Sequence, residues 1–172
     1  AGERRRRGRG DKADANAEVN IEPVIQTSLY PRSQIDIYVQ VLQQDGGVLQ
    51  ACINATTLAL ANAGIPLLDF VCAVTGGVHS TSPLLDLTQL EENDLPNVTV
   101  AVMPRSGKVT LVSMETRLHV DRFEEIFRLA GEAGTVIHGE MKRAVKERAA
   151  RLVESMRSIG KNSAGMHVEN EY

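Results

Sequence analysis

The chain has 172 residues, of which 42% are hydrophobic and 24% are charged, a composition typical of one compact domain. No apolar run approaches the roughly 20 residues that a membrane-spanning helix needs, and no apolar stretch of the secretory type follows the basic start. The sequence starts at Ala1, so we expect a fragment of a longer protein. Cys52 and Cys72 lie within apolar runs, which predicts buried thiols in a reducing compartment rather than a disulfide.

Charge is unevenly distributed along the chain, whose net charge is −3. Residues 1–12 contain six Arg or Lys side chains and two acids, and residues 140–161 contain seven and three. The stretch between these segments is acidic. Residues 1–20 have no hydrophobic period and predict a flexible basic arm. Two interpretations of this arm stay open: a solvated tail, or a segment that binds a polyanion.

The first predicted elements lie directly after this arm. Residues 21–29 predict a short helix that begins near Pro23, and residues 30–33 predict a turn. In residues 35–41, Ile and Val alternate with more polar side chains, which predicts the clearest strand of the chain. A strand inside a sheet must pair on both sides. We therefore expect this chain to need further segments or neighbouring subunits for its stability.

A buried helix is predicted over residues 48–63, ending before Gly64. Its other side, with Asn54 and Thr57, is also only mildly polar, as expected for a helix that packs on a sheet. We expect the core-facing side to consist of small and apolar residues: Val48, Ala51, Cys52, Ala55, Leu58 and Ala59.

The sheet is predicted from four short segments. Residues 69–76 and 84–87 predict two strands, and residues 98–102 and 109–114 predict a hairpin around a turn at 104–107. The chain shows no internal repeat. The predicted fold class is therefore α+β, or α/β-like, with a small mixed sheet packed against helices.

A long helix is predicted to follow the hairpin. Asp121 and Glu124 predict a capping box at its start, and an apolar stripe with helical spacing extends as far as Val153. Three glycines each weaken this helix by about 1 kcal/mol relative to alanine, which leaves a break near Gly139 open. From Gly160 onward the chain is polar, and we expect it to be disordered.

The turn at Asp45-Gly46-Gly47 is the richest place for chemistry, because it opens the helix that begins at Val48. Backbone N–H groups at a helix start are a natural binding site for anions such as phosphate. A glycine pair before a buried helix is more often only a tight turn. By itself the turn supports either interpretation.

Four strings resemble the RNase PH family in order and spacing: PRSQIDIYVQVLQQDGG, INATTLALANAGIP, DFVCAVTGG and PLLDLTQLEEN. The resemblance extends over residues 30–153, and it points to the eukaryotic RNA exosome ring subunit that corresponds to the phosphorolytic subunit of the archaeal ring. It implies a sheet-and-helix fold, six-membered rings around an RNA channel, and active relatives that degrade RNA from the 3′ end with inorganic phosphate. The family's first strands precede the arginine-rich segment. We therefore expect a basic arm at 1–20, a partial RNase PH-type domain at 21–159 and a polar disordered tail at 160–172.

At the site that the resemblance implies, this chain departs from the family. Active relatives carry Thr or Ser and then Arg after the turn, where this chain has Val48 and Leu49, whose side chains cannot hold a phosphate. Asp86 matches a proposed general acid and Glu92 stands where a second acid is expected, and both also suit structural roles. We therefore expect an inactive relative that is not an enzyme, with Val48, Leu49, Asp86 and Glu92 as vestigial positions. The alternative is an active phosphate-dependent 3′–5′ exoribonuclease.

The arginine-rich segment resembles a basic loop that the family points into the RNA channel. Arginine pairs with phosphates bidentately and reads no base identity. Because no aromatic residues are interleaved, sequence-specific stacking is not expected. The residues that we expect to bind RNA are Arg4, Arg5, Arg6, Arg7, Arg9 and Lys12.

The sequence thus predicts a non-catalytic RNA-binding and scaffold subunit of the RNA exosome ring, which guides RNA for 3′–5′ processing and degradation. The partners expected are RNA, other RNase PH-like ring subunits, RNA-binding cap subunits and a hydrolytic nuclease, with no membrane. The expected location is the nucleus, nucleolus and cytoplasm. His and Cys have no metal-ligand spacing, so neither a metal nor a cofactor is expected. A third interpretation is an unrelated α/β domain whose basic tail binds a protein.

Overall fold

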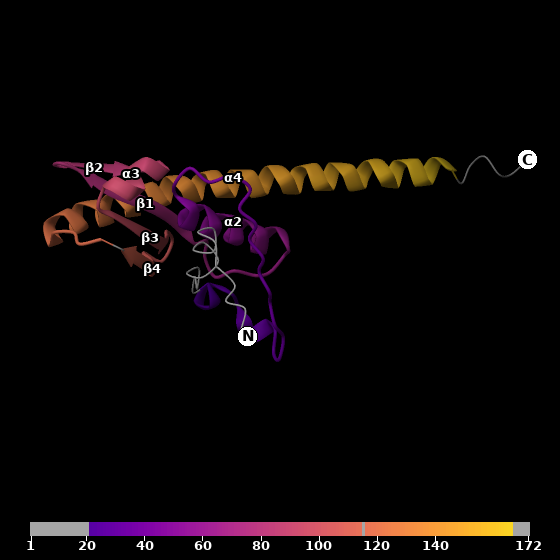
Figure 1. Cartoon of the computed structure of the whole chain (residues 1–172). Coiled ribbons are helices and arrows are strands. Elements are labelled where there is room, and N and C mark those ends of the chain that lie inside the picture. The colour runs from indigo at the N-terminus through magenta and orange to yellow at the C-terminus, as the bar shows by residue number, and fades with distance from the viewer. Residues whose placement is uncertain (1–20, 115, 167–172) are drawn as a thin grey trace, which may run out of the picture. The chain divides into compact units, whose positions relative to one another are not determined.

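The computed structural model describes residues 21–114 and 116–166. The chain divides into two compact units, Ala1–His138 and Gly139–Tyr172. None of the helices in the described ranges is long and apolar enough to cross a membrane. Figure 1 shows the elements in chain order: η1 (Glu22–Val24), η2 (Thr27–Leu29), α2 (Val48–Asn62), β1 (Cys72–His79), β2 (Ser82–Leu85), α3 (Gln89–Asp94), β3 (Asn97–Met103), β4 (Lys108–Met114) and α4 (Val120–Met166).

One four-stranded sheet, in the order β2-β1-β3-β4, organises the first unit. Every neighbouring pair is antiparallel, with Val74 opposite Val100 in the central pair. The predicted hairpin of β3 and β4 is confirmed, with a register shift at Ala101/Val102. The pairing of β1 with β2 in a second hairpin was not predicted. The α+β fold class is confirmed, and the sheet is antiparallel where we expected a mixed one.

Side chains of β3 enter two separate hydrophobic clusters, because successive residues of a strand point to opposite faces of the sheet. On one face, Val100 packs with Val74 of β1 and with Ile126 of α4. On the other face, Ala101 packs with Ile53 of α2. Both faces of β3 are therefore covered, which explains why six of its seven residues, Val98–Met103, are buried.

The buried side of α2 differs from the predicted one. The buried residues are Ile53, Thr56, Thr57 and Leu60, whereas three of the predicted core residues, Ala51, Ala55 and Ala59, are exposed. The prediction assumed that polar side chains stay outside the core, but a threonine hydroxyl can be buried when it forms hydrogen bonds. Thr57 Oγ1 lies 3.1 Å from the carbonyl oxygens of both Ile53 and Val71.

Helix α2 also covers the edge of β1 that β2 leaves open. Strand β2 pairs only with the second half of β1, from Gly76 to His79. Beside the first half, the Asn54 amide donates to the carbonyl oxygen of Ala73 (3.0 Å) and accepts from its N–H (2.8 Å). The side-chain amide of Asn54 thus takes the place of a neighbouring strand. It forms the hydrogen bonds that the N–H and carbonyl of the fully buried Ala73 need.

The strand predicted for residues 35–41 is wrong, because this segment forms neither helix nor strand and pairs with no strand in the described part of the chain. Ile37, Val39 and Val41 are each about 42–43% exposed, and Tyr38 is 91% exposed. Only Ile35 packs against a cluster, that of Ile21, Ile25 and Leu60. Alternation in the sequence predicts a shared face, but it does not supply the neighbouring strand that a sheet needs.

Residues 21–29 form two 3₁₀ turns rather than one helix. Their backbone pairs with the segment before β1 instead: the Leu68 N–H donates to the Val24 carbonyl (2.8 Å), and the Gln26 N–H donates to the Pro66 carbonyl (3.1 Å). The turn predicted at residues 30–33 is confirmed, with Arg32 at a positive φ of 59°.

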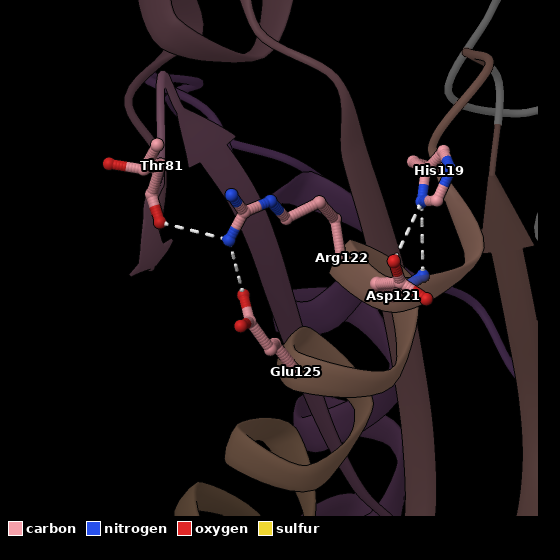
Figure 2. Close-up of polar contacts among 5 residues, drawn as sticks. All are labelled: Thr81, His119, Asp121, Arg122 and Glu125. Carbon is pink, nitrogen blue, oxygen red and sulfur yellow. Dashed lines mark hydrogen bonds and ion pairs between the residues drawn. The ribbon is translucent and has the colours of Figure 1, made fainter.

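Helix α4 begins at Val120, and the predicted capping box of Asp121 and Glu124 is wrong. Figure 2 shows the His119 imidazole beside the first turn, where Nδ1 lies 3.4 Å from the Asp121 backbone nitrogen and 3.3 Å from its carboxylate. In the same turn, Arg122 donates to the Thr81 carbonyl (3.3 Å) and to Glu125 (3.0 Å). These bonds tie the start of α4 to the turn between β1 and β2.

The glycines of α4 do not break the helix, which runs without interruption past Gly139 and Gly160 to Met166. Gly134 has a packing role, because a Cβ atom there would lie 2.6 Å from Cγ2 of Val102. We expected disorder from Gly160; residues 160–166 are helical, and residues 167–172 lie outside the described residues.

Candidate functional site

The Gly46-Gly47 turn adopts a backbone that only glycine takes easily. Gly46 has φ of 88° and Gly47, the N-cap of α2, has φ of 60°. A Cβ atom at Gly46 would overlap the carbonyl oxygen of Leu87. The turn therefore packs directly on the backbone that leads from β2 into α3, and this contact brings the predicted site residues into one corner of the fold.

Glu92 lies at the start of α2. Its Oε1 accepts a hydrogen bond from the Gly47 N–H at 2.8 Å. The N-terminus of a helix attracts negative charge because the peptide dipoles align there. A carboxylate of the chain itself thus occupies part of the place where the sequence suggested an anion site.

Asp86 is held on the other side of this corner through Gln50. The Gln50 amide donates to Asp86 Oδ1 (2.7 Å) and accepts from the Thr75 N–H (2.5 Å). Asp86 has a positive φ of 59°, which costs a non-glycine residue about 1 kcal/mol or more. Its own N–H donates to the Thr75 carbonyl (3.0 Å), and its side chain is exposed. An exposed carboxylate is thus fixed beside the first turn of α2.

Leu49 belongs to the hydrophobic interior rather than to this corner. Leu49 is partly buried and packs against the cluster that contains Ile53 and Ala101, so it serves the interior. Val48 is also partly buried. Of the four predicted site positions, the structure therefore brings Asp86 and Glu92 together around the start of α2, and it assigns Leu49 to the core.

Helix α3 completes the corner and carries further acids. Thr88 and Glu91 form a capping box, and the hydrogen bonds from Thr88, the backbone one first, lower the pKa of the Glu91 carboxyl. The Gln89 amide oxygen accepts from Gln44 (2.6 Å), which ties α3 to the segment before the glycine turn. Acidic groups therefore predominate here: Asp45, Asp86, Glu91 and Glu92.

Gln50 is the residue of this corner that sequence reasoning missed. It stands three residues after Gly47, in the first helical turn, where a side chain points back toward the helix start. That position is a usable signal, but only the fold shows that Thr75 and Asp86 are its partners.

The predicted RNA-binding residues Arg4, Arg5, Arg6, Arg7, Arg9 and Lys12 lie outside the described residues. A search of the described ranges finds no group of three or more His, Cys, Asp or Glu side chains that could hold a metal ion. Neither Cys52 nor Cys72 forms a disulfide, and Cys72 is fully buried. Burial, followed by the nearby Asp69, raises the pKa of the Cys72 thiol to about 12.

Comparison with known families gives two adjoining matches. The model of the 3′ exoribonuclease family, domain 1 (RNase PH) matches residues 1–66, and the model of domain 2 matches residues 69–133. Together they cover more than half of the chain in its sequence order.

Similar curated proteins are components of one assembly. The chain is 44% identical over 151 residues to "Exosome complex component RRP41" of Homo sapiens, covering 85% of this chain and 62% of that protein. It is 47% identical over 135 residues to "Exosome complex component ski6" of Schizosaccharomyces pombe, covering 78% of this chain and 56% of that protein. The chain therefore spans about three fifths of the length of these relatives.

A solved structure supports the fold. The crystal structure of rice (Oryza sativa) Rrp46 matches with a TM-score of 0.59 and 24% identity, over 62% of this chain and 52% of that one. At this identity the likeness concerns the fold alone.

These comparisons overturn one prediction. The sequence led us to expect an inactive relative that is not an enzyme, yet both matching models describe a 3′ exoribonuclease family, and the relatives are named as RRP41-type components. That prediction is wrong. It depended on Val48 and Leu49, and two missing side-chain contacts do not exclude positive charge supplied by other segments or subunits.

The glycine turn that opens α2 is bonded to Glu92, and the first helical turn is bonded to Asp86 through Gln50. This arrangement and the two adjoining matches agree, and the chain belongs to the RNase PH family of 3′ exoribonucleases.

Proposed function

We propose that this chain is a ring subunit of an RNA exosome that binds RNA during its 3′–5′ processing and degradation. The observation that carries the proposal is the 44% identity, over 85% of this chain, to a protein named as an exosome complex component. The fold agrees, since the chain resembles the RNase PH-type structure of Rrp46 in its sheet and helices.

The arm at residues 4–12 supplies the chemistry for RNA binding in this proposal. Its five arginines and one lysine can neutralise phosphates, and each neutralised phosphate releases counterions. Arginine also forms two parallel hydrogen bonds with one phosphate. Binding through these residues is therefore independent of base sequence.

The partners in this proposal are other RNase PH-like ring subunits, RNA-binding cap subunits and a hydrolytic nuclease. Location in the nucleus, nucleolus and cytoplasm is part of the same proposal. The acidic corner around Asp86 supports a need for partners, because negatively charged RNA approaches it only if cations come from the arm or from a neighbouring subunit.

The test is RNA binding by the assembled complex at several salt concentrations. Replacement of Arg4, Arg5, Arg6, Arg7 and Arg9 by Ala weakens binding equally for unrelated RNA sequences. The slope of log affinity against log salt falls by roughly one unit for each phosphate-binding charge that is removed. A control replaces Arg117 and Arg157, two exposed arginines outside the arm, by Ala.

Unchanged RNA affinity in the arm variant at low salt would show that the arm is a solvated tail. A reduction confined to one RNA sequence would show base recognition instead. Either result contradicts the proposed role of the arm. If the variant still assembles into an intact ring, the assignment of the chain as a ring subunit is unaffected by that result.

A second candidate function is phosphate-dependent cleavage at this chain's own corner. The observation that favours it is Asp86, an exposed carboxylate held at 2.7 Å by Gln50 beside the start of α2, where a general acid can reach a bound RNA end. Because acids predominate at the corner, the phosphate needs cations from outside it.

Release of nucleoside diphosphates by the assembled complex tests this second function. The expected result is phosphate-dependent release that falls at least about a hundredfold in Asp86→Asn, the usual size of a general-acid effect. Asp94→Asn, at the exposed end of α3, is the matched control. Equal rates for the two variants would contradict cleavage at this corner.

A further inference from the structure

The second unit carries an apolar stripe along one side of α4. Val145, Ala149, Leu152 and Met156 are spaced four, three and four residues apart, the spacing of a seam between two coiled helices. Leu152 is 56% exposed and Met156 is 62% exposed. Large apolar side chains exposed in register along a helix mark a contact surface rather than scattered surface residues.

The acids of this stretch all lie on the opposite side of the helix. Glu140, Glu147 and Glu154 are seven residues apart and lie roughly half a turn from the centre of the stripe at about 100° per residue. Arg143 forms ion pairs with Glu140 and, at 3.8 Å, with Glu147. The acidic side chains of this stretch are therefore confined to the far side of the helix, where two of them pair with Arg143.

The positions beside the stripe carry the opposite charge. In a heptad with Val145 and Leu152 at d and Ala149 at a, Lys146 is at e and Arg148 is at g. Val153 and Ser155 occupy the next e and g positions, so no acid borders the stripe between residues 145 and 156. A second copy of the same helix offers no acid to these two cations, because its own flanking positions hold none, whereas an acidic helix would pair with them.

From this arrangement we propose that residues 142–156 of α4 are a docking site for an acidic amphipathic helix of another protein. The partner's apolar face covers Val145, Leu152 and Met156, and its Glu or Asp side chains pair with Lys146 and Arg148. The apolar contacts supply the affinity, and the flanking charges select the partner. This site shares no residue with the corner at Asp86 or with the basic arm.

The test uses the full chain and two fluorescent peptides of about four heptads with Leu at a and d. One peptide has Glu at e and g, and its match has Lys there. In fluorescence anisotropy the acidic peptide binds, and the basic peptide binds at least about tenfold more weakly.

Two pairs of substitutions locate the binding on the helix. The double substitution Leu152→Gln and Met156→Gln lowers the affinity for the acidic peptide by about tenfold or more, because polar side chains replace the apolar surface that the peptide covers. Glu147→Gln with Glu154→Gln, on the far side, leaves the affinity unchanged. These side chains are exposed, so circular dichroism should find the helix intact in both variants.

Charge reversal supplies the sharpest outcome. Lys146→Glu with Arg148→Glu makes the chain prefer the basic peptide. Equal binding of both peptides, or acidic-peptide binding that survives the Leu152 and Met156 changes, would place the contact elsewhere, for example on the arginine-rich arm.

Two other outcomes would identify a different occupant. Self-association of the chain that depends on Leu152 would show that a second copy covers the stripe. If the substitutions lower RNA affinity and leave peptide binding unchanged, the surface binds RNA. Each of these results overturns the proposal.

Discussion

Strand β3 and the segment at residues 35–41 have the same sequence pattern, with apolar β-branched side chains at every second position, yet they differ in burial. Val100 in β3 is 1% exposed, while Val39 in the other segment is 43% exposed. Strand β3 has β1 and β4 as neighbours and helices on both faces. The segment at 35–41 has no strand neighbour among the described residues.

The difference teaches that alternation reports which side chains share a face, whereas burial depends on neighbours that local sequence does not reveal. In β3, interior contacts replace water on both sides. At 35–41 the same side chains remain in contact with solvent. Stability should therefore respond strongly to changes in and around β3 and weakly to changes in 35–41.

The largest expected effect is at Ile126, the α4 side chain that covers β3. It is fully buried between Val74 and Val100, so Ile126→Ala leaves a cavity and lowers the free energy of unfolding by about 2–5 kcal/mol. The strand at residues 35–41 that led us to expect dependence on neighbouring subunits does not form, so urea denaturation of the purified chain measures this decrease. Val136→Ala, at an exposed position of the same helix, is the control. A decrease below about 1 kcal/mol at Ile126 would mean that α4 does not close this face.

The matched valines give the next test. Val100→Ala removes a buried side chain and costs about 1.5–3 kcal/mol, whereas Val39→Ala costs less than about 1 kcal/mol because Val39 already contacts water. The same urea experiment compares them. Equal decreases would show that residues 35–41 are covered in solution, and the contrast with β3 would fail.

A smaller decrease is expected where α2 takes the place of a strand. Asn54→Ala removes both hydrogen bonds to Ala73 and leaves a buried N–H and carbonyl without them, at a cost of about 1–3 kcal/mol. Asn62→Ala at the exposed end of α2 serves as control. If Asn54→Ala is as stable as this control, β1 does not depend on α2 for its open edge.

The smallest effect concerns pH and the capping box of α3. Thr88 lowers the pKa of Glu91 in the folded chain, so the ionised carboxylate adds stability above its unfolded pKa. This contribution disappears as the pH falls through the lowered folded value. The stability difference between the wild type and Glu91→Gln should therefore shrink on acidification below about pH 4. A difference that stays constant from about pH 7 to about pH 3 would contradict the cap.

Local signals predicted the elements whose partners are close in sequence. The hairpin of β3 and β4 surrounds a turn, and α2 follows a glycine pair and ends before Gly64. The buried side of α2 was missed because Thr56 and Thr57 are polar, and their burial depends on bonds such as that from Thr57 to Val71. Such bonds arise only when distant segments meet.

The candidate site was partly predictable for the same reason. The glycine turn has a local signature, and the family resemblance identified Asp86 and Glu92. Sequence could not show that Glu92 accepts from Gly47, or that Gln50 connects Asp86 to β1, because these pairs are 45 and 36 residues apart. The absence of Arg at residue 49 does not decide activity, because it concerns a single position of the site.

Native mass spectrometry tests the assignment to an exosome ring most directly. The chain is mixed with the other subunits of an exosome ring, with and without a single-stranded RNA. We expect a ring that contains this chain and retains RNA, and a ring of unchanged composition that releases RNA when Arg4, Arg5, Arg6, Arg7 and Arg9 are replaced by Ala. A chain that stays out of every ring, while the other subunits assemble without it, would contradict the assignment.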